Sequence, residues 1–469
     1  MSDPARPASV LCAIDAQISP LVPGGTETHT VLQIDALARH SRERFLVIGL
    51  KDQAELLRPY LGANMDLLAF PKNYIWYREG VPDRYRPRPE WVPLLKVAGP
   101  FRDTVLDLMR CYGDGAVLSP EAEALRRRLA PLGGLAPAVW RMFHGQKTKD
   151  HEFLTAAETD AVLRPWRPKV VHFPYPNHFE TRLPFVFEPW GLPHYHMPEV
   201  YTQDQIRWID GLFRDGCMRA HTVITGTRWV KDDLMRHYGL PSSRIAVLPR
   251  IPVFDDPTKT DGPDDALGDV PESFALFPGV TWDTKNHLGL IRGMARLRDE
   301  YGLKLNLVCT GRTVKPAFPL IEQEIAALGL GDQIRFLGRI SRTRLNRLFR
   351  KAKFLVHPSK FEGLGLPLVE ALHFDLPIVA SNAACIPEVL GDAAILFDPD
   401  DPEAIAVALR TAITSPELRD ELRIRGRRRL KEYFPTHEGL ADRFTAVYKR
   451  AARLPLTEAE RDLIGQMTA

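Results

Sequence analysis

The stretch HPSKFEGLGLPLVEAL, residues 357–372, combines the end of an expected strand, a glycine turn and the start of an expected helix. Its apolar lead-in predicts a buried strand over 354–359, and Pro367 suits the first turn of a helix. Glycine lets the backbone approach a ligand closely, and a helix N-terminus favours a phosphate. The stretch therefore predicts a strand–turn–helix unit of a parallel α/β domain with a phosphate-binding turn.

Two glutamates, Glu362 and Glu370, flank this turn eight positions apart. A carboxylate beside a phosphate site is electrostatically unfavourable unless it binds hydroxyl groups. The pair therefore favours a ligand with hydroxyls at both ends of a diphosphate, namely a sugar, a diphosphate and a ribose. An ordinary turn with surface glutamates is the alternative, because glycine turns after strands are common.

Strand-like and helix-like segments alternate on both sides of this stretch, which predicts two doubly wound, Rossmann-like α/β domains facing across a cleft. A helix is expected at 26–40 with Thr26 as its N-cap, and the composition of 252–272 marks a linker. The expected strands are 9–15, 44–50, 169–176, 221–227 and 245–251 in the first half, and 274–280, 304–311, 333–338, 354–359, 377–381 and 394–398 in the second.

The expected domains are residues 1–255, residues 273–435, and a helical segment, 436–469, that packs back on the first domain. Residues 64–160 are interpreted as an insertion in the first domain. This insertion carries one clear amphipathic helix, near 120–132.

The composition is that of a globular protein: 469 residues, 45% hydrophobic and 26% charged, with a net charge of +3. The small net charge argues against a nucleic-acid partner. Five scattered cysteines form no CxxC pair and suit a reducing cytoplasm. No signal peptide and no membrane-spanning run is predicted, so the expected location is the cytoplasm, with any membrane contact peripheral at the inner face.

Residues 357–406 strongly resemble the retaining glycosyltransferases of the GT-B fold, family 4, also called group 1. The E-x7-E motif of that family matches Glu362 and Glu370 in spacing and context. Residues 277–291 and 334–359 resemble the family too, the former especially its mannosyltransferase-like members. The resemblance extends more weakly to 24–29 and 170–179.

The resemblance implies a donor site in the second domain. Glu370 would bind the ribose, Glu362 the donor sugar near the reacting centre, and Lys285 the diphosphate, where its charge would stabilise the leaving group. A solvated lysine is the alternative for Lys285. The remaining donor-side residues implied are Gly363, Leu364 and Gly365 at the turn, Arg339 and Ile340 near the base, and Gly25 across the cleft. A plain loop is the alternative for Gly25, Arg339 and Ile340, and Arg312 is either a second phosphate contact or a surface residue.

The chain departs from the family pattern at 187–201. Counting back from Pro198–Glu199, Trp190 and Gly191 occupy the places where relatives often carry His and Asp. Tryptophan cannot act as a base but can stack on a sugar, so Trp190 is an acceptor-side candidate. His194 or His196 are possible substitutes for the missing histidine, although a histidine in a proline-rich loop more often hydrogen-bonds locally.

No required metal is predicted. Asp398 and Asp400 have the D-x-D spacing that binds metal in another glycosyltransferase fold, but turn and N-cap chemistry explains them better before a helix. The basic segments 342–353 and 423–431 are interpreted as solvated helix faces, with attraction to anionic lipid as the alternative. In 342–353, an apolar stripe is expected to be the buried face: Leu345, Leu348, Phe349 and Ala352.

The resemblance therefore implies a retaining hexosyltransferase that uses a nucleotide-sugar, GDP-mannose in preference to a UDP-sugar, and needs no other cofactor. The acceptor would be a glycan or a lipid-linked glycan of cell-surface polysaccharide synthesis. The alternative from another class is a non-catalytic relative that binds a nucleotide-sugar or glycan in support of a partner enzyme. Epimerases and phosphorylases share the GT-B lobes, but the E-x7-E match argues against them.

Overall fold

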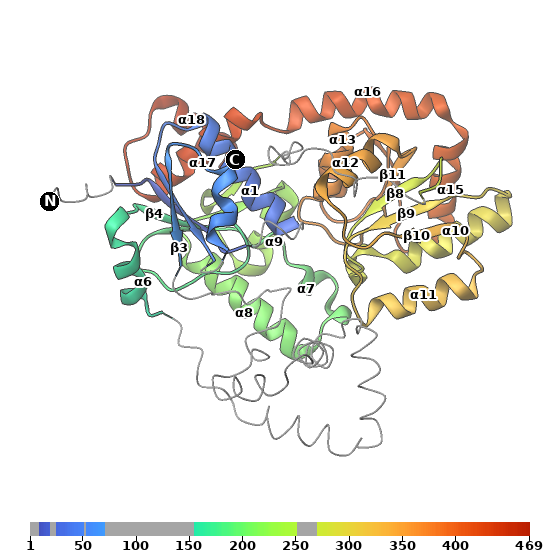
Figure 1. The fold of residues 1–469 in the computed structure, drawn as a ribbon, viewed down its shortest axis with the longest axis horizontal. Helices are drawn as coiled ribbons and strands as arrows, with labels where there is room; N and C mark the ends of the chain where they lie inside the picture. The colour runs from blue at the N-terminus through green and yellow to red at the C-terminus, as the bar shows by residue number, and fades with distance from the viewer. Residues whose placement is uncertain (1–8, 19–24, 51–52, 71–153, 251–269) are drawn as a thin grey trace, which may run out of the picture. The chain divides into compact units, whose positions relative to one another are not determined.

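Two parallel β-sheets form the framework of the protein in a computed structural model that describes residues 9–18, 25–50, 53–70, 154–250 and 270–469 (Figure 1). The sheet of the first lobe contains β1 (Cys12–Ala16), β2 (Phe45–Gly49), β3 (Met65–Ala69), β4 (Val170–Phe173), β5 (Phe185–Phe187), β6 (Thr222–Thr225) and β7 (Ile245–Val247). The sheet of the second lobe contains β8 (Ala275–Pro278), β9 (Leu307–Thr310), β10 (Ile334–Phe336), β11 (Phe354–His357), β12 (Ile378–Ser381) and β13 (Ala394–Phe397).

Strand order in the second lobe is β10-β9-β8-β11-β12-β13, with every pair parallel. The chain winds outward from β8 in one direction and then returns to continue from β11 in the other. The direction reverses between β8 and β11, and the loops after neighbouring parallel strands diverge at such a point. A ligand is therefore expected beyond the carboxyl ends of these two strands.

Helices cover both faces of this second sheet. Successive side chains of a strand point to opposite faces, so apolar strands give each face its own apolar residues to bury. Phe277 and Val356 pack with α10 (His287–Tyr301) and α15 (Pro402–Thr414). Leu276 and Leu355 pack on the other face with three helices: α12 (Arg342–Lys351), α13 (Leu366–His373) and α14 (Ile386–Leu390). Near-continuous apolar strands are what a sheet buried on both faces requires.

The first lobe repeats this arrangement. Its strands lie in the order β3-β2-β1-β4-β5-β6-β7, all parallel, with the reversal between β1 and β4. Its helices are α1 (Gly25–His40), α6 (Ala156–Leu163), α7 (Pro193–His196), α8 (Gln203–Arg219) and α9 (Arg228–Tyr238), and α11 (Ala317–Ala327) completes the second lobe.

The chain ends on the first lobe. After α16 (Pro416–Tyr433) come α17 (His437–Ala451) and α18 (Glu458–Thr468) (Figure 1), and the carbonyl of the last residue, Ala469, accepts a hydrogen bond from Lys231 on α9. The apolar face of α17 shares one core cluster with β1 and α1, to which Phe444 and Tyr448 contribute fully buried rings. The last helices are therefore part of the hydrophobic core of the first lobe.

The expected doubly wound α/β organisation is confirmed, and each of the expected strands overlaps an observed one. Two strands were not expected. Strand β5 has three residues between Pro184 and Pro189, and β3 is a five-residue edge strand at the start of the predicted insertion. Prolines on both sides of β5 and the partial exposure of β3 remove the bounded apolar run that predicted the other strands.

Thr26 is not the N-cap of its helix, because α1 already begins at Gly25. The predicted helix near 120–132 and nearly all of the predicted linker lie outside the described residues. Along α12 the predicted apolar stripe is confirmed: Leu348, Phe349 and Ala352 are buried, and Leu345 packs against their cluster.

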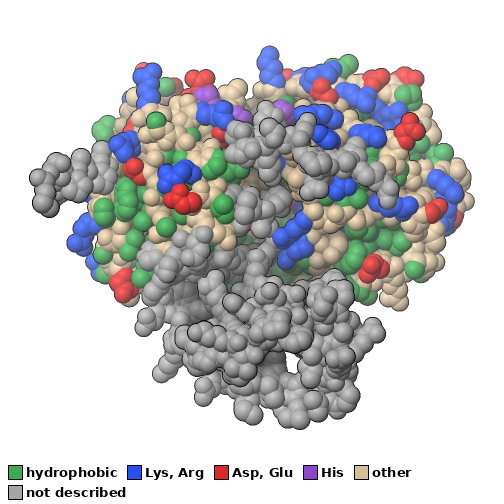
Figure 2. All heavy atoms as spheres, viewed as in Figure 1, with side chains coloured by type: hydrophobic (Ala, Val, Ile, Leu, Met, Phe, Trp, Pro, Cys, Tyr) green, Lys and Arg blue, Asp and Glu red, His purple; other side chains and the backbone are tan. Residues whose placement is uncertain are grey.

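The basic run on α16 lies among acidic partners. Arg423 and Arg425 pair with acids of their own helix, Asp420 and Glu421. Further pairs reach Asp375 and Asp392 from Arg427 and Arg428, and Figure 2 shows blue and red side chains interspersed over the face that it displays. These pairs agree with the solvated-face interpretation. Of the helices described, none has the length and apolar character to cross a bilayer.

Replacing Phe444 by Ala tests whether α17 belongs to the core of the first lobe. Loss of a fully buried ring leaves a cavity, and we expect the free energy of unfolding to fall by about 3–5 kcal/mol. Urea unfolding followed by circular dichroism measures the change. Ile424→Ala on α16, at a side chain that is 62% exposed, is the matched control and should change stability by less than about 0.5 kcal/mol. Equal effects of both changes would contradict this packing.

Candidate active site

Lys285 and Glu362 meet at the carboxyl end of the second sheet, where the strand order reverses. Lys285 ends a short 3₁₀ helix, Asp283–Lys285, that follows β8, and Glu362 lies on the loop that follows β11. The lysine Nζ lies 2.5 Å from Oε1 of Glu362, although 77 positions separate the two residues. Neighbouring parallel strands thus bring the two predicted residues together.

His357, the last residue of β11, completes this group. Its Nε2 lies 2.9 Å from the same Oε1 of Glu362, and its side chain is fully buried. Burial alone would raise the pKa of Glu362, but the Lys285 ammonium and the His357 hydrogen bond outweigh burial and hold that pKa well below its usual range. Burial lowers the pKa of His357, which Glu362 only partly opposes. Glu362 is therefore an ionised carboxylate held by a cation and a neutral imidazole N–H.

One oxygen of Glu362 is left for a ligand. Both contacts use Oε1, and among the described residues no hydrogen bond reaches Oε2. The Lys285 side chain is 19% exposed and that of Glu362 is 11% exposed. The pair therefore offers solvent one cationic group and one acceptor oxygen side by side.

The turn after Glu362 needs its two glycines for different reasons. Gly365 has a φ of 74°, a left-handed conformation that favours glycine. At Gly363, a Cβ would lie 1.8 Å from the backbone oxygen of Trp190 in the first lobe. Leu364 lies between them, and its side chain would be 3.0 Å from a Cβ added at Gly226. The glycine turn is thus the place where the backbones of the two lobes come closest in this region.

Two side chains from neighbouring elements fix the backbone at this turn, and a third joins the lobes beside it. Thr227, the N-cap of α9, donates its hydroxyl to the carbonyl of Gly363 at 3.0 Å. Cys385 donates its thiol to the carbonyl of Glu362 at 3.1 Å. The carboxylate of Glu388 accepts hydrogen bonds from the backbone N–H groups of Arg228 and Trp229, both at 2.8 Å. A carboxylate of the second lobe therefore caps the first turn of a helix of the first lobe.

Glu370 lies on the second turn of α13 and is 5% exposed. Its Oε1 accepts a hydrogen bond from Nη1 of Arg342, the first residue of α12, at 2.6 Å. The buried carboxylate is thus neutralised by an arginine in the absence of any ligand. Arg342 is a partner that spacing alone did not indicate.

Arg339 and Ile340 follow β10, at the same edge of the sheet. Gly338, with a φ of 64°, turns the chain there, and its carbonyl accepts the N–H of Gly311 at the end of β9. Arg339 is exposed and Ile340 is half-buried against the cluster of α12 and α13. Both residues therefore stand at the ligand-facing edge that the topology predicts, as does Arg312 directly after Gly311.

Trp190 and Gly191 both have positive φ, 63° and 121°. The indole Nε1 of Trp190 donates to the carbonyl of Pro174 at 3.1 Å, and its ring meets His29 edge-on at 5.2 Å between centroids. A Cβ at Gly191 would lie 2.9 Å from the ring of Phe361, one residue before Glu362. The backbone of Trp190 therefore lies against Gly363, and Gly191 lies against the ring of Phe361, which precedes the turn.

The two nearby histidines lie in local networks. His194 is 3% exposed, and its Nε2 lies 3.5 Å from Oδ1 of Asp210. His196 Nε2 lies 2.8 Å from Oδ1 of Asp233. These contacts are of the local hydrogen-bonding kind that the sequence offered as the alternative for both histidines. Gly25, the residue of the first lobe that was expected on the donor side, is the exposed first residue of α1.

The D-x-D pair is used in local structure. Asp398 accepts the backbone N–H of Asp400 at 2.9 Å, and Asp400 pairs with Lys360. Asp401, the next residue, is the N-cap of α15. Turn and cap chemistry therefore accounts for this acidic run, as expected.

Two family models match the chain. The model described as "Glycosyl transferases group 1" matches residues 266–429, and the one described as "Glycosyltransferase Family 4" matches residues 117–251. The first match contains the whole Lys285–Glu362–Glu370 arrangement. Both halves of the chain thus carry models of the family that the E-x7-E motif indicates.

Similar curated proteins include the O-antigen chain mannosyltransferase B of Escherichia coli, which is 25% identical over 58% of this chain and 72% of its own length. The O-antigen chain mannosyltransferase RfbU of Salmonella typhimurium is 28% identical over 48% of this chain and 59% of its length. The MMP alpha-(1->4)-mannosyltransferase of Mycolicibacterium hassiacum is 36% identical over 34% of this chain and 39% of its length.

Solved structures share the architecture at low sequence identity. Sucrose-phosphate synthase from Thermosynechococcus elongatus superposes with a TM-score of 0.61 at 15% identity, covering 95% of this chain and 99% of that one. WaaG, a glycosyltransferase involved in lipopolysaccharide biosynthesis, gives 0.57 at 14% identity, covering 93% and 99%. These similarities confirm the expected GT-B fold.

Replacing Lys285 by Met tests the electrostatics of the site. The change leaves the carboxylate of Glu362 buried without its cation, so we expect the free energy of unfolding at pH 7 to fall by about 3 kcal/mol. Urea unfolding measures this loss. The double variant Lys285→Met/Glu362→Gln is the matched control, and it should recover most of the lost stability because no buried charge remains.

The same pair predicts a pH dependence. The pKa of Glu362 is depressed in the folded state, so its contribution to stability is full above the unfolded value of about 4.3 and declines as the pH falls below that value. The unfolded state is common to both proteins, so the stability difference between wild type and Lys285→Met should shrink as the pH falls below the folded-state pKa of Glu362 in the variant, which burial without the cation raises. A difference that stays constant down to pH 3 would argue against an ionised Glu362.

Proposed function

We propose that this chain, which belongs to the group 1 glycosyltransferases of family 4, moves a hexose from a nucleotide-sugar to an acceptor hydroxyl with retention at the anomeric carbon. The observation that carries this proposal is the Lys285–Glu362–His357 group at the carboxyl ends of β8 and β11. This group places a cation and a fixed carboxylate at the same edge of the sheet as the glycine turn from which α13 begins.

The proposed reaction breaks the bond between the anomeric carbon and the diphosphate and forms a bond from that carbon to the acceptor oxygen on the same face. The acceptor proton passes to the departing phosphate oxygen, so no enzymic base is required. Negative charge grows on the diphosphate, and stabilising charge where it develops is the most effective use of fixed electrostatics. Lys285 and the first N–H groups of α13 would supply that stabilisation.

Glu362 would orient the donor sugar through Oε2, the oxygen that its protein partners leave open. Its low pKa keeps it an acceptor for sugar hydroxyls at neutral pH. Glu370 would bind the ribose, for which it must exchange or share its hydrogen bond with Arg342. The turn Gly363-Leu364-Gly365 would face the diphosphate, while Arg339 and Ile340 would lie near the base.

On the acceptor side, Trp190 would present part of its ring to the incoming glycan, with Gly25 opposite the diphosphate. The names of the relatives support transfer of a mannosyl group to an acceptor in O-antigen or other cell-surface polysaccharide synthesis. The donor proposed is GDP-mannose in preference to a UDP-sugar. A lipid-linked acceptor would bring the enzyme to a membrane surface.

A thermal-shift panel tests the donor assignment. A ligand that binds only the folded state must raise the melting temperature, by an amount that grows with its concentration over its Kd. We expect GDP and GDP-mannose to raise it more than UDP, ADP and their sugar conjugates, without magnesium. A flat panel would contradict the donor site and favour the non-catalytic alternative.

The roles of the two glutamates separate in kinetics. We expect Glu370→Gln to raise the donor KM roughly 10- to 100-fold with little effect on kcat, because a charged hydrogen bond is worth about 1.5–3 kcal/mol. Glu362→Gln should lower kcat by about 10²–10³-fold with a smaller change in KM. Glu432→Gln on α16 is the surface control. Equal effects of both substitutions on KM and kcat would contradict these roles.

The stereochemical outcome has its own measurement. Proton NMR of the transferred sugar, taken early in the reaction, should show the anomeric configuration of the donor. An inverted product would overturn the proposed same-face attack while leaving the donor assignment intact.

A further inference from the structure

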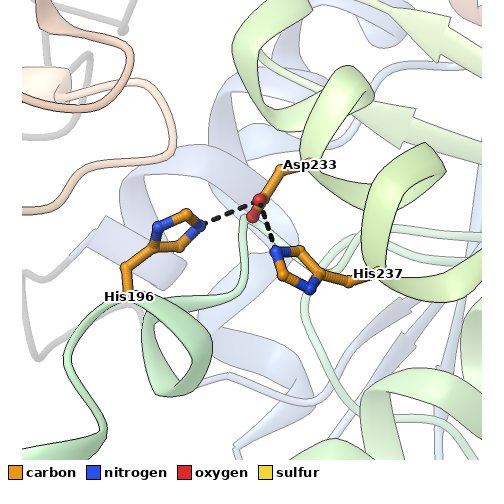
Figure 3. Close-up of side chains that lie close together, drawn as sticks. All are labelled: His196, Asp233 and His237. Carbon is orange, nitrogen blue, oxygen red and sulfur yellow. Dashed lines mark hydrogen bonds and ion pairs between the residues drawn. The ribbon is translucent and has the colours of Figure 1, made fainter.

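Three side chains outside the proposed active site converge on one point. His196 ends α7, while Asp233 and His237 lie four positions apart on one face of α9 (Figure 3). The Nε2 atoms of the two histidines lie 2.8 and 3.3 Å from the same oxygen, Oδ1 of Asp233. The i, i+4 spacing on a helix is the arrangement by which two side chains reach a common ligand.

The distances fit a tetrahedral metal site. Zinc lies about 2.0–2.2 Å from histidine nitrogen and carboxylate oxygen, which separates tetrahedral ligand atoms by roughly 3.3 Å. The three ligand atoms here all lie within 4.8 Å of one another, and the two histidine–aspartate distances lie close to the tetrahedral value. Only small side-chain rotations would be needed to receive an ion.

The second observation is the state of the Asp233 carboxylate. Asp233 is 2% exposed, and its Oδ2 has no hydrogen-bond partner although it is buried. Two imidazoles thus point at one oxygen while the other oxygen of the same buried carboxylate is unsatisfied, which is unfavourable for a purely hydrogen-bonded cluster. A cation between Oδ1 and the two ring nitrogens would bring positive charge to the buried carboxylate and bind both imidazoles. The histidine side chains are 28% and 25% exposed, which gives an ion access.

A second cluster within the described ranges has similar ligand types but differs in its charge balance. His178, Glu180 and Asp215 also lie within reach of one another. Both of its carboxylates already pair with Arg219, at 2.8 and 2.9 Å. An arginine therefore occupies the place that a metal ion would take, and this cluster serves as a natural comparison.

We propose that His196, Asp233 and His237 form a binding site for a divalent transition-metal ion of the zinc class, with water as the fourth ligand. Two imidazoles and one carboxylate suit zinc and not magnesium, which prefers oxygen ligands in an octahedron. The ion would join α7 to α9 and act as a structural link, separate from the transfer chemistry.

The site connects to the glycine turn through one aromatic contact. The ring of His196 stacks on Phe361 at 5.5 Å between centroids and packs against Trp229 at 4.9 Å. Phe361 directly precedes Glu362, and Trp229 is held by Glu388. An ion that fixes the His196 ring would therefore hold the contact between the first lobe and the turn that carries Glu362.

The test uses the full chain with any polyhistidine tag removed and with metal stripped by EDTA. Isothermal titration with ZnCl₂ should show one tight equivalent, accompanied by a rise in melting temperature that saturates at that stoichiometry. Co²⁺ at the same site should give the visible absorption of a four-coordinate ion, and Mg²⁺ should give neither signal. We expect His237→Gln and Asp233→Asn to weaken zinc binding by about 100-fold or more, since even partners of ligands matter 10- to 100-fold.

His178→Gln is the matched control and should bind zinc as the wild type does. Should Asp233→Asn fold poorly, His196→Gln, at a partly exposed ring, provides the same test. Wild-type binding no tighter than that of His237→Gln would overturn the proposal and leave a hydrogen-bonded His–Asp–His cluster. Loss of binding in His178→Gln alone would overturn it too, by assigning the ion to the other cluster.

Discussion

A buried carboxylate must be balanced by positive charge or hydrogen bonds, and the surroundings of Glu362 follow from that constraint. Its loop follows β11, and the cation that balances it comes from the loop after β8. Only a sheet that places these strands side by side can bring Lys285 and Glu362 together. The parallel order of the second sheet is therefore a condition of the proposed chemistry, and its apolar strands are what the two helical layers require.

A second constraint is the space at Gly363. The carbonyl of Trp190 lies where any side chain at 363 would have to be, so the two lobes approach here backbone to backbone. Thr227 and Glu388 hold the same region by hydrogen bonds that cross between the lobes. The backbones of Trp190 and Gly191 are thus fitted to this turn, because a larger residue at Gly363 or at Gly191 would meet the opposite lobe.

Much of the architecture could be predicted, because each strand of a sheet buried on both faces is an apolar run bounded by turn residues. The motif around Glu362 also indicated Lys285 through family resemblance. His357 was within the quoted stretch, but nothing local shows that a strand-ending histidine turns toward a residue five positions later. Arg342, Thr227 and Glu388 could not be found from spacing, since their partners are distant in sequence and joined only by the packing of separate elements.

The first lobe contains a counterpart of the Glu362 group. Glu188, directly after β5, is 1% exposed, and Arg250 and His29 lie 2.7 and 3.0 Å from its Oε2. Burial alone would raise the pKa of Glu188. The Arg250 guanidinium and the contacts with His29 and His172 outweigh burial, so this carboxylate too remains ionised. Trp190 follows Glu188 by two positions, and Gly363 directly follows Glu362. Each lobe thus anchors, through a buried carboxylate at the end of a parallel strand, the backbone segment that meets the other lobe.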